Sequence, residues 1–389
     1  MPSALLLQGG GPTPVLNASL YGVWDEMRNF GSSGRLWGSR SGIKGLLTGA
    51  FLDLSAQSPE LMAAIRLAPG AALGSSRDPL AGDDFARVLE VLRRHDIHWV
   101  FFNGGNGSMG TALELQAAAV ASRYELQVMG IPKTVDNDLF VTDHTPGYAS
   151  AGRFWAHAVR DMGMDHRALP SPILISEVIG RNVGWVVAAT AFARHYAGDA
   201  PHLIYCPERR LPRARLLADI EEVYRKLGRV FVCLCEGQLD ENGNAFDADV
   251  DQPDNPRRRL ASNLAHAVAR FVTRELSLRT RSERPSLLGR SCSLAVPEID
   301  RSEAEECGRA AVRAAAGGEL GQMVALRRES YVPYASSTFL APLKDVARRE
   351  RQMPAEFLCP SGHDVTAAYL DYARPLIGPI APHARFSAV

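Results

Sequence analysis

The residues whose side chains are best suited to catalysis lie in one short stretch, GIPKTVDNDL at residues 130–139. This stretch follows an apolar run and contains Lys133, Thr134, Asp136 and Asp138. A lysine can neutralise a phosphate, a threonine can position one, and a carboxylate can accept a hydroxyl proton during phosphoryl transfer. From composition alone, the alternative is a turn rich in Asx residues that carries a charge pair.

Two glycine-rich turns each follow an apolar run and precede a segment with helical spacing. The first turn, GGG at residues 9–11, follows the run at residues 3–8, and the second, GGNGS at residues 104–108, follows residues 98–103. We expect a helix over residues 111–122 after the second turn. Backbone N–H groups bind phosphate where glycines let them converge at the start of a helix. One such turn can be a tight connection only, but two together favour a phosphorylated ligand.

A third candidate is the segment GRNVGW at residues 180–185, in which glycines would let Arg181 approach an anion closely. A cation near a helix start is mildly disfavoured by the helix dipole, so Arg181 needs another reason to be there, and an anionic ligand is one. Glu236 ends the apolar run at residues 230–235, where a parallel sheet binds its ligands. Glu236 could hold sugar hydroxyls, or be an exposed acid at a strand end.

Arginines gather later in the chain, around LGRS at residues 288–291. Arg281 and Arg290 could grip a phosphate monoester, because the guanidinium group forks around two phosphate oxygens. For Arg279 and Arg284 we favour a solvated basic turn.

The elements that must position these residues follow a βα alternation, which predicts helices around a mainly parallel sheet. Residues 240–259 are interpreted as a long surface loop or a hairpin. The segments RRERQMP and YLDYARPLI near the end are interpreted as pieces that cap one domain without chemistry of their own. Further strands are predicted at residues 127–131, 173–178, 202–206, 230–235 and 323–326.

Composition excludes several classes of protein. The chain has 389 residues with 43 Lys+Arg and 43 Asp+Glu, so its balanced charge argues against a broad electrostatic grip on nucleic acid or an acidic membrane. Its length predicts two domains with a cleft, and no apolar run reaches the roughly 20 residues of a membrane helix. We therefore expect a cytoplasmic protein. Cys233 and Cys235 are interpreted as small core residues, and the absence of G-x-G-x-x-G disfavours a dinucleotide-dependent oxidoreductase.

Taken in order, these motifs resemble the phosphofructokinase family along nearly the whole chain. They are GGGPTPVLN, LGSSR at residues 73–77, GGNGS, PKTVDND, GRNVGW, CEG and LGRS, and PKTVDND is the most specific of them. The continuations VTDHTPGYAS and APHLIYCPE are similar to those of bacterial diphosphate-dependent 6-phosphofructokinases.

The resemblance implies a two-domain α/β fold with mainly parallel sheets flanked by helices and an active site in the interdomain cleft. Residues 1–147 and about 288–330 would form the phosphoryl-donor domain. Residues 148–287 and about 331–389 would form the sugar-phosphate domain. A sugar site shared between subunits, as is common in this family, would make the protein a homo-oligomer, either a dimer or a tetramer.

The resemblance also implies a role for each matching residue. Asp136 would take the proton from the C1 hydroxyl of fructose 6-phosphate, with Thr134 and Asp138 beside it, Lys133 near the phosphoryl donor and Arg181 at the transferring group. The sugar phosphate would be held by Thr134, Gly180, Arg181, Glu236, Arg281 and Arg290. The donor would be held by Gly10, Gly11, Arg77, Gly105, Asn106, Gly107 and Ser108, and Mg²⁺ would accompany it near Asn106 and Asp136.

Departures from the family pattern concern the donor and the sugar. Gly107 stands where the diphosphate branch has an aspartate that helps to exclude a nucleotide, so it admits ATP. Lys133 is typical of diphosphate users, and Asn106 replaces the aspartate of ATP-dependent members, so we favour diphosphate. Gly289 replaces the usual residue before Arg290, and PDNPRRR replaces a glycine-rich element. Another phosphosugar, or a paralogue that binds and regulates a partner, is therefore the alternative.

Overall fold

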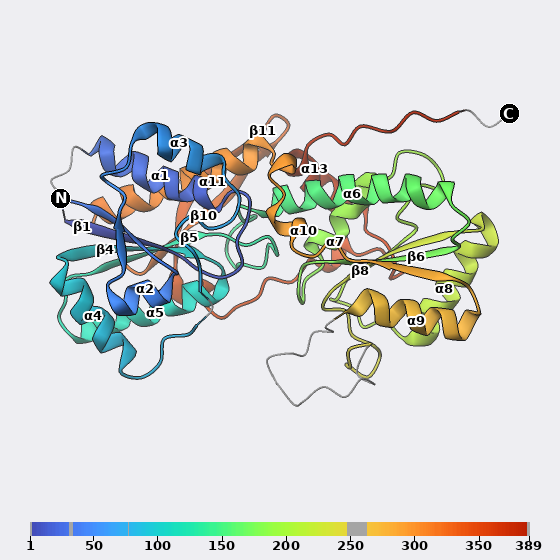
Figure 1. Ribbon diagram of the computed structural model, residues 1–389, viewed down its shortest axis with the longest axis horizontal. Coiled ribbons are helices and arrows are strands. Elements are labelled where there is room, and N and C mark those ends of the chain that lie inside the picture. Colours follow the sequence, from blue (N-terminus) through green and yellow to red (C-terminus); the bar gives the residue numbers. More distant parts are fainter. Residues whose placement is uncertain (1, 31–33, 77, 247–262, 387–389) are drawn as a thin grey trace. The chain divides into compact units, whose positions relative to one another are not determined.

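The computed structural model of the protein describes residues 2–30, 34–76, 78–246 and 263–386 (Figure 1). Two units share the chain, and each is assembled from two stretches of sequence. The first unit comprises residues 1–150 and 290–351, and the second comprises residues 151–289 and 352–389.

The first unit is built on a seven-stranded sheet with the order β11-β10-β5-β4-β1-β2-β3. The neighbouring pairs from β10 to β2 are parallel, whereas β11 and β3 are antiparallel edge strands. The strand bounds are β1 Ser3–Gln8, β2 Leu36–Ser39, β3 Phe51–Asp53, β4 Ile97–Gly104, β5 Gln127–Pro132, β10 Gln322–Tyr331 and β11 Tyr334–Pro342.

Helices cover both faces of this sheet, and the alternation of side chains along β1 shows why. Leu5 and Leu7 point into one apolar cluster, with residues of α2, α4 and α5, while Ala4 and Leu6 point into another, with residues of α1, α3 and α11 (Figure 1). The helix bounds are α1 Leu16–Asn29, α2 Ile43–Thr48, α3 Pro59–Leu67, α4 Asp84–Arg94, α5 Asn106–Ala121, α11 Glu298–Ala316 and α12 Leu343–Val346.

The second unit contains a four-stranded parallel sheet with the order β7-β8-β6-β9. All six residues of β6, ILISEV, are buried, as expected of a parallel strand that helices cover on both faces. The strands are β6 Ile173–Val178, β7 Leu203–Tyr205, β8 Val230–Cys235 and β9 Thr280–Glu283. The helices are α7 Trp185–Ala189, α8 Arg213–Leu227, α9 Leu264–Leu276, α13 Ala367–Ile377, and α6 Tyr148–Ala168 and α10 Leu288–Ser291, which both cross the boundary between the units.

The predicted α/β architecture is confirmed, and strands occur at each predicted place. One prediction was wrong, because residues 331–351 belong to the first unit and not to the second. The predicted strand at residues 323–326 is the start of the longer β10, which turns back into β11 and pairs with it along its length. The antiparallel hairpin therefore returns this part of the chain to the first sheet.

Two smaller predictions concern a loop and the cysteines. Residues 240–246 form a turn in which Asp240 Oδ1 accepts N–H bonds from Asn242 and Asn244, while residues 247–259 of the predicted loop lie outside the described part. Cys233 and Cys235 are free thiols with no exposed surface, so their interpretation as core residues is confirmed. Among the described residues, no helix is long and apolar enough to cross a membrane.

Candidate active site

The stretch that carries the predicted catalytic residues begins where β5 ends, at the carboxyl edge of the first sheet. Lys133 N donates to the carbonyl of Gly104 at 3.1 Å, and Asp136 N donates to Thr134 Oγ1 at 3.1 Å. Thr134 and Asp138 are buried, with 8% and 7% of their surface exposed, whereas Asp136 is partly exposed. Asp136 is therefore the more accessible of the two carboxylates in this loop.

Lys133 links this loop to the first glycine turn. Its ammonium Nζ donates to the carbonyl of Gly11 at 2.7 Å. Lys133 is buried, with 3% of its surface exposed. Gly10 has a φ of +76°, and a Cβ atom there would lie 3.3 Å from Lys133 Nζ. Glycine at this position thus permits both the left-handed backbone and the close approach of the lysine.

The second glycine turn lies against the first. A Cβ atom on Gly9 or on Gly104 would lie only 2.3 or 2.1 Å from Ser108 Oγ, so the turns fit together only without side chains. Gly105 is the residue before α5, and the helix starts at Asn106, five residues earlier than predicted. The N–H groups of residues 106–108 are therefore in the first helical turn, where the dipole favours an anion.

The first glycine turn differs from the prediction in this respect. α1 starts at Leu16, after Val15, so residues 9–11 do not form the start of the helix. Instead the turn is held by the segment LGSSR, since Gly10 N donates to the carbonyl of Ser76 at 3.1 Å and Ser75 Oγ donates to the carbonyl of Gly10 at 2.7 Å. Arg77, the last residue of that motif, lies outside the described residues.

Asn106 and Gly107 differ in their surroundings. Asn106 Nδ2 donates to the carbonyl of Arg349, while its buried Oδ1 has no hydrogen-bond partner within the described part of the chain. A buried amide oxygen without a partner suits a hard cation such as Mg²⁺. At Gly107, a Cβ atom would meet no atom within 4 Å, so the space beside it is open.

The chain after the loop is fixed by a buried charged cluster. His144 is fully buried between Asp143 Oδ2 at 2.8 Å and Glu303 Oε2 at 2.6 Å. Burial alone would lower the pKa of His144, but the charge of Glu303 and hydrogen bonds to both carboxylates raise this pKa to about 9. Arg328 also pairs with Asp143, at 3.0 Å, and Tyr334 donates to Glu303 at 2.7 Å. The cluster joins the chain just after the loop at residues 133–138 to α11 and the β10–β11 hairpin.

In the second unit, the loop with Arg181 connects β6 to α7. Gly180 and Arg181 both have positive φ angles, +147° and +51°. Their N–H groups donate to Glu236 Oε1 at 3.4 and 3.2 Å, and a Cβ atom on Gly237 would lie 1.7 Å from the carbonyl oxygen of Arg181. Burial raises the pKa of the Cys235 thiol, which stays protonated and donates to the carbonyl of Arg181 at 3.3 Å. The backbone of Arg181 is thus fixed while its side chain is exposed.

The two units contain different parts of the predicted set. The first brings together both glycine turns and residues 133–138, and the second brings together Arg181 and Glu236. Arg281 is exposed on β9. Arg290 lies in α10, where it is the first residue of the returning chain in the first unit. Among the described residues, no cluster of three or more His, Cys, Asp or Glu side chains is arranged as a metal site.

Sequence reasoning missed some residues that hold these loops. Asn137, with a φ of +59°, accepts at Oδ1 from the N–H of Thr145 at 3.0 Å. Glu208 accepts at Oε1 from Gly184 N at 2.8 Å. The only available signal was that Asn137 lies inside PKTVDND and Glu208 inside APHLIYCPE.

Comparison with known proteins gives consistent matches. A family profile described as Phosphofructokinase matches residues 3–315. A pyrophosphate–fructose 6-phosphate 1-phosphotransferase of Rhodospirillum rubrum is 36% identical over 387 residues, which are 98% of this chain and 95% of the relative.

Solved structures match over the full length. The crystal structure of the pyrophosphate-dependent phosphofructokinase of Nitrosospira multiformis has a TM-score of 0.89 at 30% identity, covering 100% of this chain and 95% of that one. The corresponding enzyme of Marinobacter aquaeolei has a TM-score of 0.88 at 30% identity, covering 100% and 94%.

Proposed function

This chain belongs to the phosphofructokinase family, and we propose that it transfers a phosphoryl group from diphosphate to the C1 hydroxyl of fructose 6-phosphate. The observation that carries this proposal is the edge of the first sheet. There Lys133 reaches the first glycine turn at Gly11 while the accessible carboxylate Asp136 follows in the same loop. The full-length relatives named for pyrophosphate support the same phosphoryl donor.

The reaction forms one bond and breaks one. The C1 hydroxyl oxygen of the sugar attacks a phosphorus atom of diphosphate, the bond to the bridging oxygen breaks, and phosphate leaves. Asp136 accepts the hydroxyl proton, as its partly exposed carboxylate permits, and Thr134 and Asp138 flank the hydroxyl. The products are fructose 1,6-bisphosphate and phosphate.

Charge on the transferring group is balanced by fixed groups of the protein. Lys133, the N–H groups at the start of α5 and the exposed guanidinium of Arg181 would face phosphoryl oxygens, and such preorganised groups lower the barrier to phosphoryl transfer. Mg²⁺ would be held by Asn106 Oδ1 and Asp136 together with the donor oxygens, and would neutralise charge on them.

The remaining site residues keep the roles that the family resemblance implies. Gly10, Gly11, Arg77, Gly105, Gly107 and Ser108 would contact the phosphoryl donor, and Gly180, Glu236, Arg281 and Arg290 the sugar phosphate. The named donor residues lie in the first unit, whereas Gly180, Glu236 and Arg281 of the sugar-phosphate set lie in the second and Arg290 in the first. One oxygen of Glu236 already accepts backbone N–H groups, so its other oxygen would bind the sugar hydroxyls.

ATP is the second candidate for the phosphoryl donor, because the open space at Gly107 would admit the rest of a nucleotide. Lys133 and Asn106 favour diphosphate. We also propose a homo-oligomer that completes the sugar site across a subunit interface, which light scattering of the purified protein would test. A cytoplasmic location stays a prediction from the sequence, and a place in glycolysis stays one from the family resemblance.

The proposal is tested with Asp136→Asn, which keeps the shape of the side chain and removes the base. We expect the variant to bind fructose 6-phosphate with unchanged affinity and to lose about 10²–10⁴-fold in kcat with diphosphate and Mg²⁺. Asp371→Asn, at an exposed carboxylate on α13, is the matched control and should keep the wild-type rate. A folded Asp136→Asn protein with near-normal turnover would contradict the assignment of Asp136 as the base and with it the proposed function.

A further inference from the structure

The segment after α12 carries the chain from the first unit into the second, with the boundary between Arg351 and Gln352. Its sequence, RRERQMP, contains no recognisable motif. Within the first unit, Glu350 forms an antiparallel bridge with Leu139, just after the catalytic loop. This segment therefore runs along the loop that carries Asp136.

Arg351 forms several hydrogen bonds between this segment and the loop. Its backbone N–H donates to the carbonyl of Asp138 at 2.8 Å. Its guanidinium donates to the carbonyl of Asn137 from Nη2 at 3.1 Å and to the carbonyl of Thr142 from Nη1 at 2.6 Å, and Nη1 also reaches the carbonyl of Asp143. One side chain thus fixes both ends of the turn that follows Asp136.

These bonds act on the residue next to the base. Asn137 is in the left-handed region, and its side chain is held by Thr145, so its carbonyl direction is set by Arg351 and its amide oxygen by Thr145. On the other side, Asp136 N is held by Thr134 Oγ1. The backbone on both sides of Asp136 is therefore held by hydrogen bonds.

Two residues beyond Arg351, the same segment is bound to the arginine loop of the second unit. Met353 N donates to Glu208 Oε1 at 3.1 Å, and this oxygen also accepts from Gly184 N at 2.8 Å, at the end of the loop that carries Arg181. Met353 is 3% exposed, so the bond is shielded from water. One short stretch of chain is therefore tied to both loops, each within its own unit.

We propose that Arg351 and Glu208 are positioning residues for phosphoryl transfer. Arg351 holds the backbone that aims Asp136, and Glu208 holds the backbone that aims Arg181, with residues 351–353 as their common support. The inference rests on the proposed function of these loops. A displacement of about 1 Å in a reacting group can cost on the order of 10²-fold in rate, so such anchors affect turnover more than binding.

Arg351→Met tests this, because methionine keeps much of the side-chain stem and removes all the guanidinium donors. We expect kcat with diphosphate and fructose 6-phosphate to fall about 30–100-fold, with both KM values changing less than about threefold. Guanidinium chloride at about 50 mM, below denaturing concentrations, should restore at least part of the lost rate by filling the vacated space, whereas equal sodium chloride should not. A merely structural role would give no rescue.

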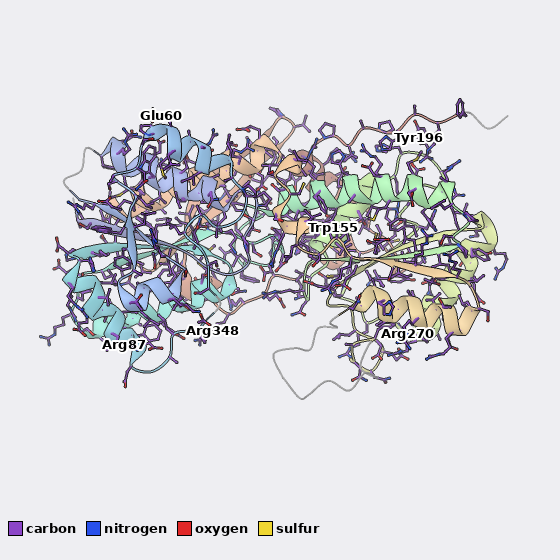
Figure 2. All side chains as sticks on the ribbon, in the orientation of Figure 1. Glu60, Arg87, Trp155, Tyr196, Arg270 and Arg348 are labelled. Atoms are coloured by element: carbon purple, nitrogen blue, oxygen red, sulfur yellow. The ribbon has the colours of Figure 1, made fainter. Side chains whose placement is uncertain are left out.

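Arg348→Met is the matched control. Arg348, labelled in Figure 2, lies in the same segment, is exposed over 76% of its side chain and pairs with Glu114 on the surface of α5. This variant should keep kcat within about twofold and show no rescue. Should Arg351→Met fail to fold, Arg351→Lys is measured instead. That variant keeps the charge and loses the fork, and it should lose about tenfold in kcat.

The common support is tested by a double-mutant cycle. Glu208→Gln keeps an acceptor oxygen and should lower kcat about 3–10-fold. The loss in the Arg351→Lys, Glu208→Gln double variant should be smaller than the product of the two single losses, because groups that act as one unit are not additive. A loss in the double variant equal to the product of the two single losses would show that residues 351–353 are not a common support.

Two outcomes separate this inference from the function on which it rests. A wild-type protein that transfers phosphate to no phosphosugar, from either diphosphate or ATP, would contradict the proposed function. An active wild type with an Arg351→Met kcat within threefold of normal, or with a loss that guanidinium does not relieve, would overturn the inference alone.

Discussion

The loop at residues 134–138 and the loop at residues 180–184 carry side chains of opposite charge and are anchored by groups of opposite charge. The first presents Asp136, and its carbonyls accept from the guanidinium of Arg351. The second presents Arg181, and its N–H groups donate to the carboxylates of Glu236 and Glu208. Each anchor therefore fixes the backbone of the loop and not the functional side chain itself.

After the loss of the base in Asp136→Asn, the largest effect should come from removing the charge of the second loop. Arg181→Gln should lower kcat with diphosphate about 10²–10³-fold, because a fixed group that stabilises the transferring phosphoryl is lost. The exposed side chain makes a change in folding stability small. Steady-state kinetics and thermal unfolding would measure both. Arg279→Gln, at an exposed arginine of the same unit, should match wild type, and equal rates for the two variants would refute the role of Arg181.

The stability of the first unit should depend on another pairing of opposite charges, that of His144 with Asp143 and Glu303. His144→Leu leaves the buried carboxylate of Glu303 without its cation, whereas Asp143 keeps its ion pair with Arg328, so we expect a loss of about 3–5 kcal/mol in the free energy of unfolding. His202→Leu in the second unit removes one acceptor, for the N–H of Phe231, and should cost about 1–3 kcal/mol. Urea unfolding monitored by hydrogen exchange would resolve the units. Equal losses of unfolding free energy in the two variants would contradict the expected difference between the two histidines.

The two histidines should also respond to pH with opposite signs. The pKa of His144 is raised to about 9, so its contribution is full below about pH 6.5 and is lost as pH rises through 9. Burial lowers the pKa of His202 to about 4, so its contribution is full above about pH 6.5 and is lost as pH falls toward 4.

Unfolding free energies at several pH values would check these signs. The gap between wild type and His144→Leu should narrow from pH 6.5 to 9.5, and the gap between wild type and His202→Leu should narrow from pH 6.5 to 4. A pH-independent gap in either variant would show that the corresponding histidine does not titrate as its surroundings indicate.

The smallest effect is expected at Gly107, in the second glycine turn at the start of α5, where the family resemblance implies an aspartate in diphosphate users. A Cβ atom there meets nothing within 4 Å, and an acid in the first turn of α5 favours the helix dipole, so Gly107→Asp should change stability by less than about 1 kcal/mol. Diphosphate turnover should stay within about threefold while any use of ATP falls. Loss of diphosphate activity in this variant would show that the open space serves the diphosphate itself.

Local patterns were sufficient for much of this molecule. The predicted strand at residues 173–178 is β6 itself, because a continuous apolar run between turn residues has few other solutions in a parallel sheet. The stretch PKTVDND was recognised because its polar residues are adjacent in sequence. The glycines at 9–11 and 104–108 were found for the same reason, and the structure places them against each other.

The anchors could not be found in this way. Arg351 acts on the carbonyl of Asn137, which is 214 residues away, and every residue has a carbonyl, so no pattern of side chains marks the acceptor. Glu208 accepts from the N–H of Met353, which is 145 residues away. Every residue except proline has such an N–H, so no sequence pattern marks this donor either. The β10–β11 hairpin, which brings Arg351 back to the first unit, depends on pairing of a polar edge strand that apolar periodicity does not reveal.

The central claim is the transfer of a phosphoryl group from diphosphate to fructose 6-phosphate, and one assay tests it most directly. Purified protein, Mg²⁺ and fructose 6-phosphate are supplied with diphosphate or with ATP in parallel, and formation of fructose 1,6-bisphosphate is followed. We predict product with diphosphate at a kcat/KM well above that with ATP. Product with ATP alone would contradict the donor assignment, and no product with either would contradict the claim itself.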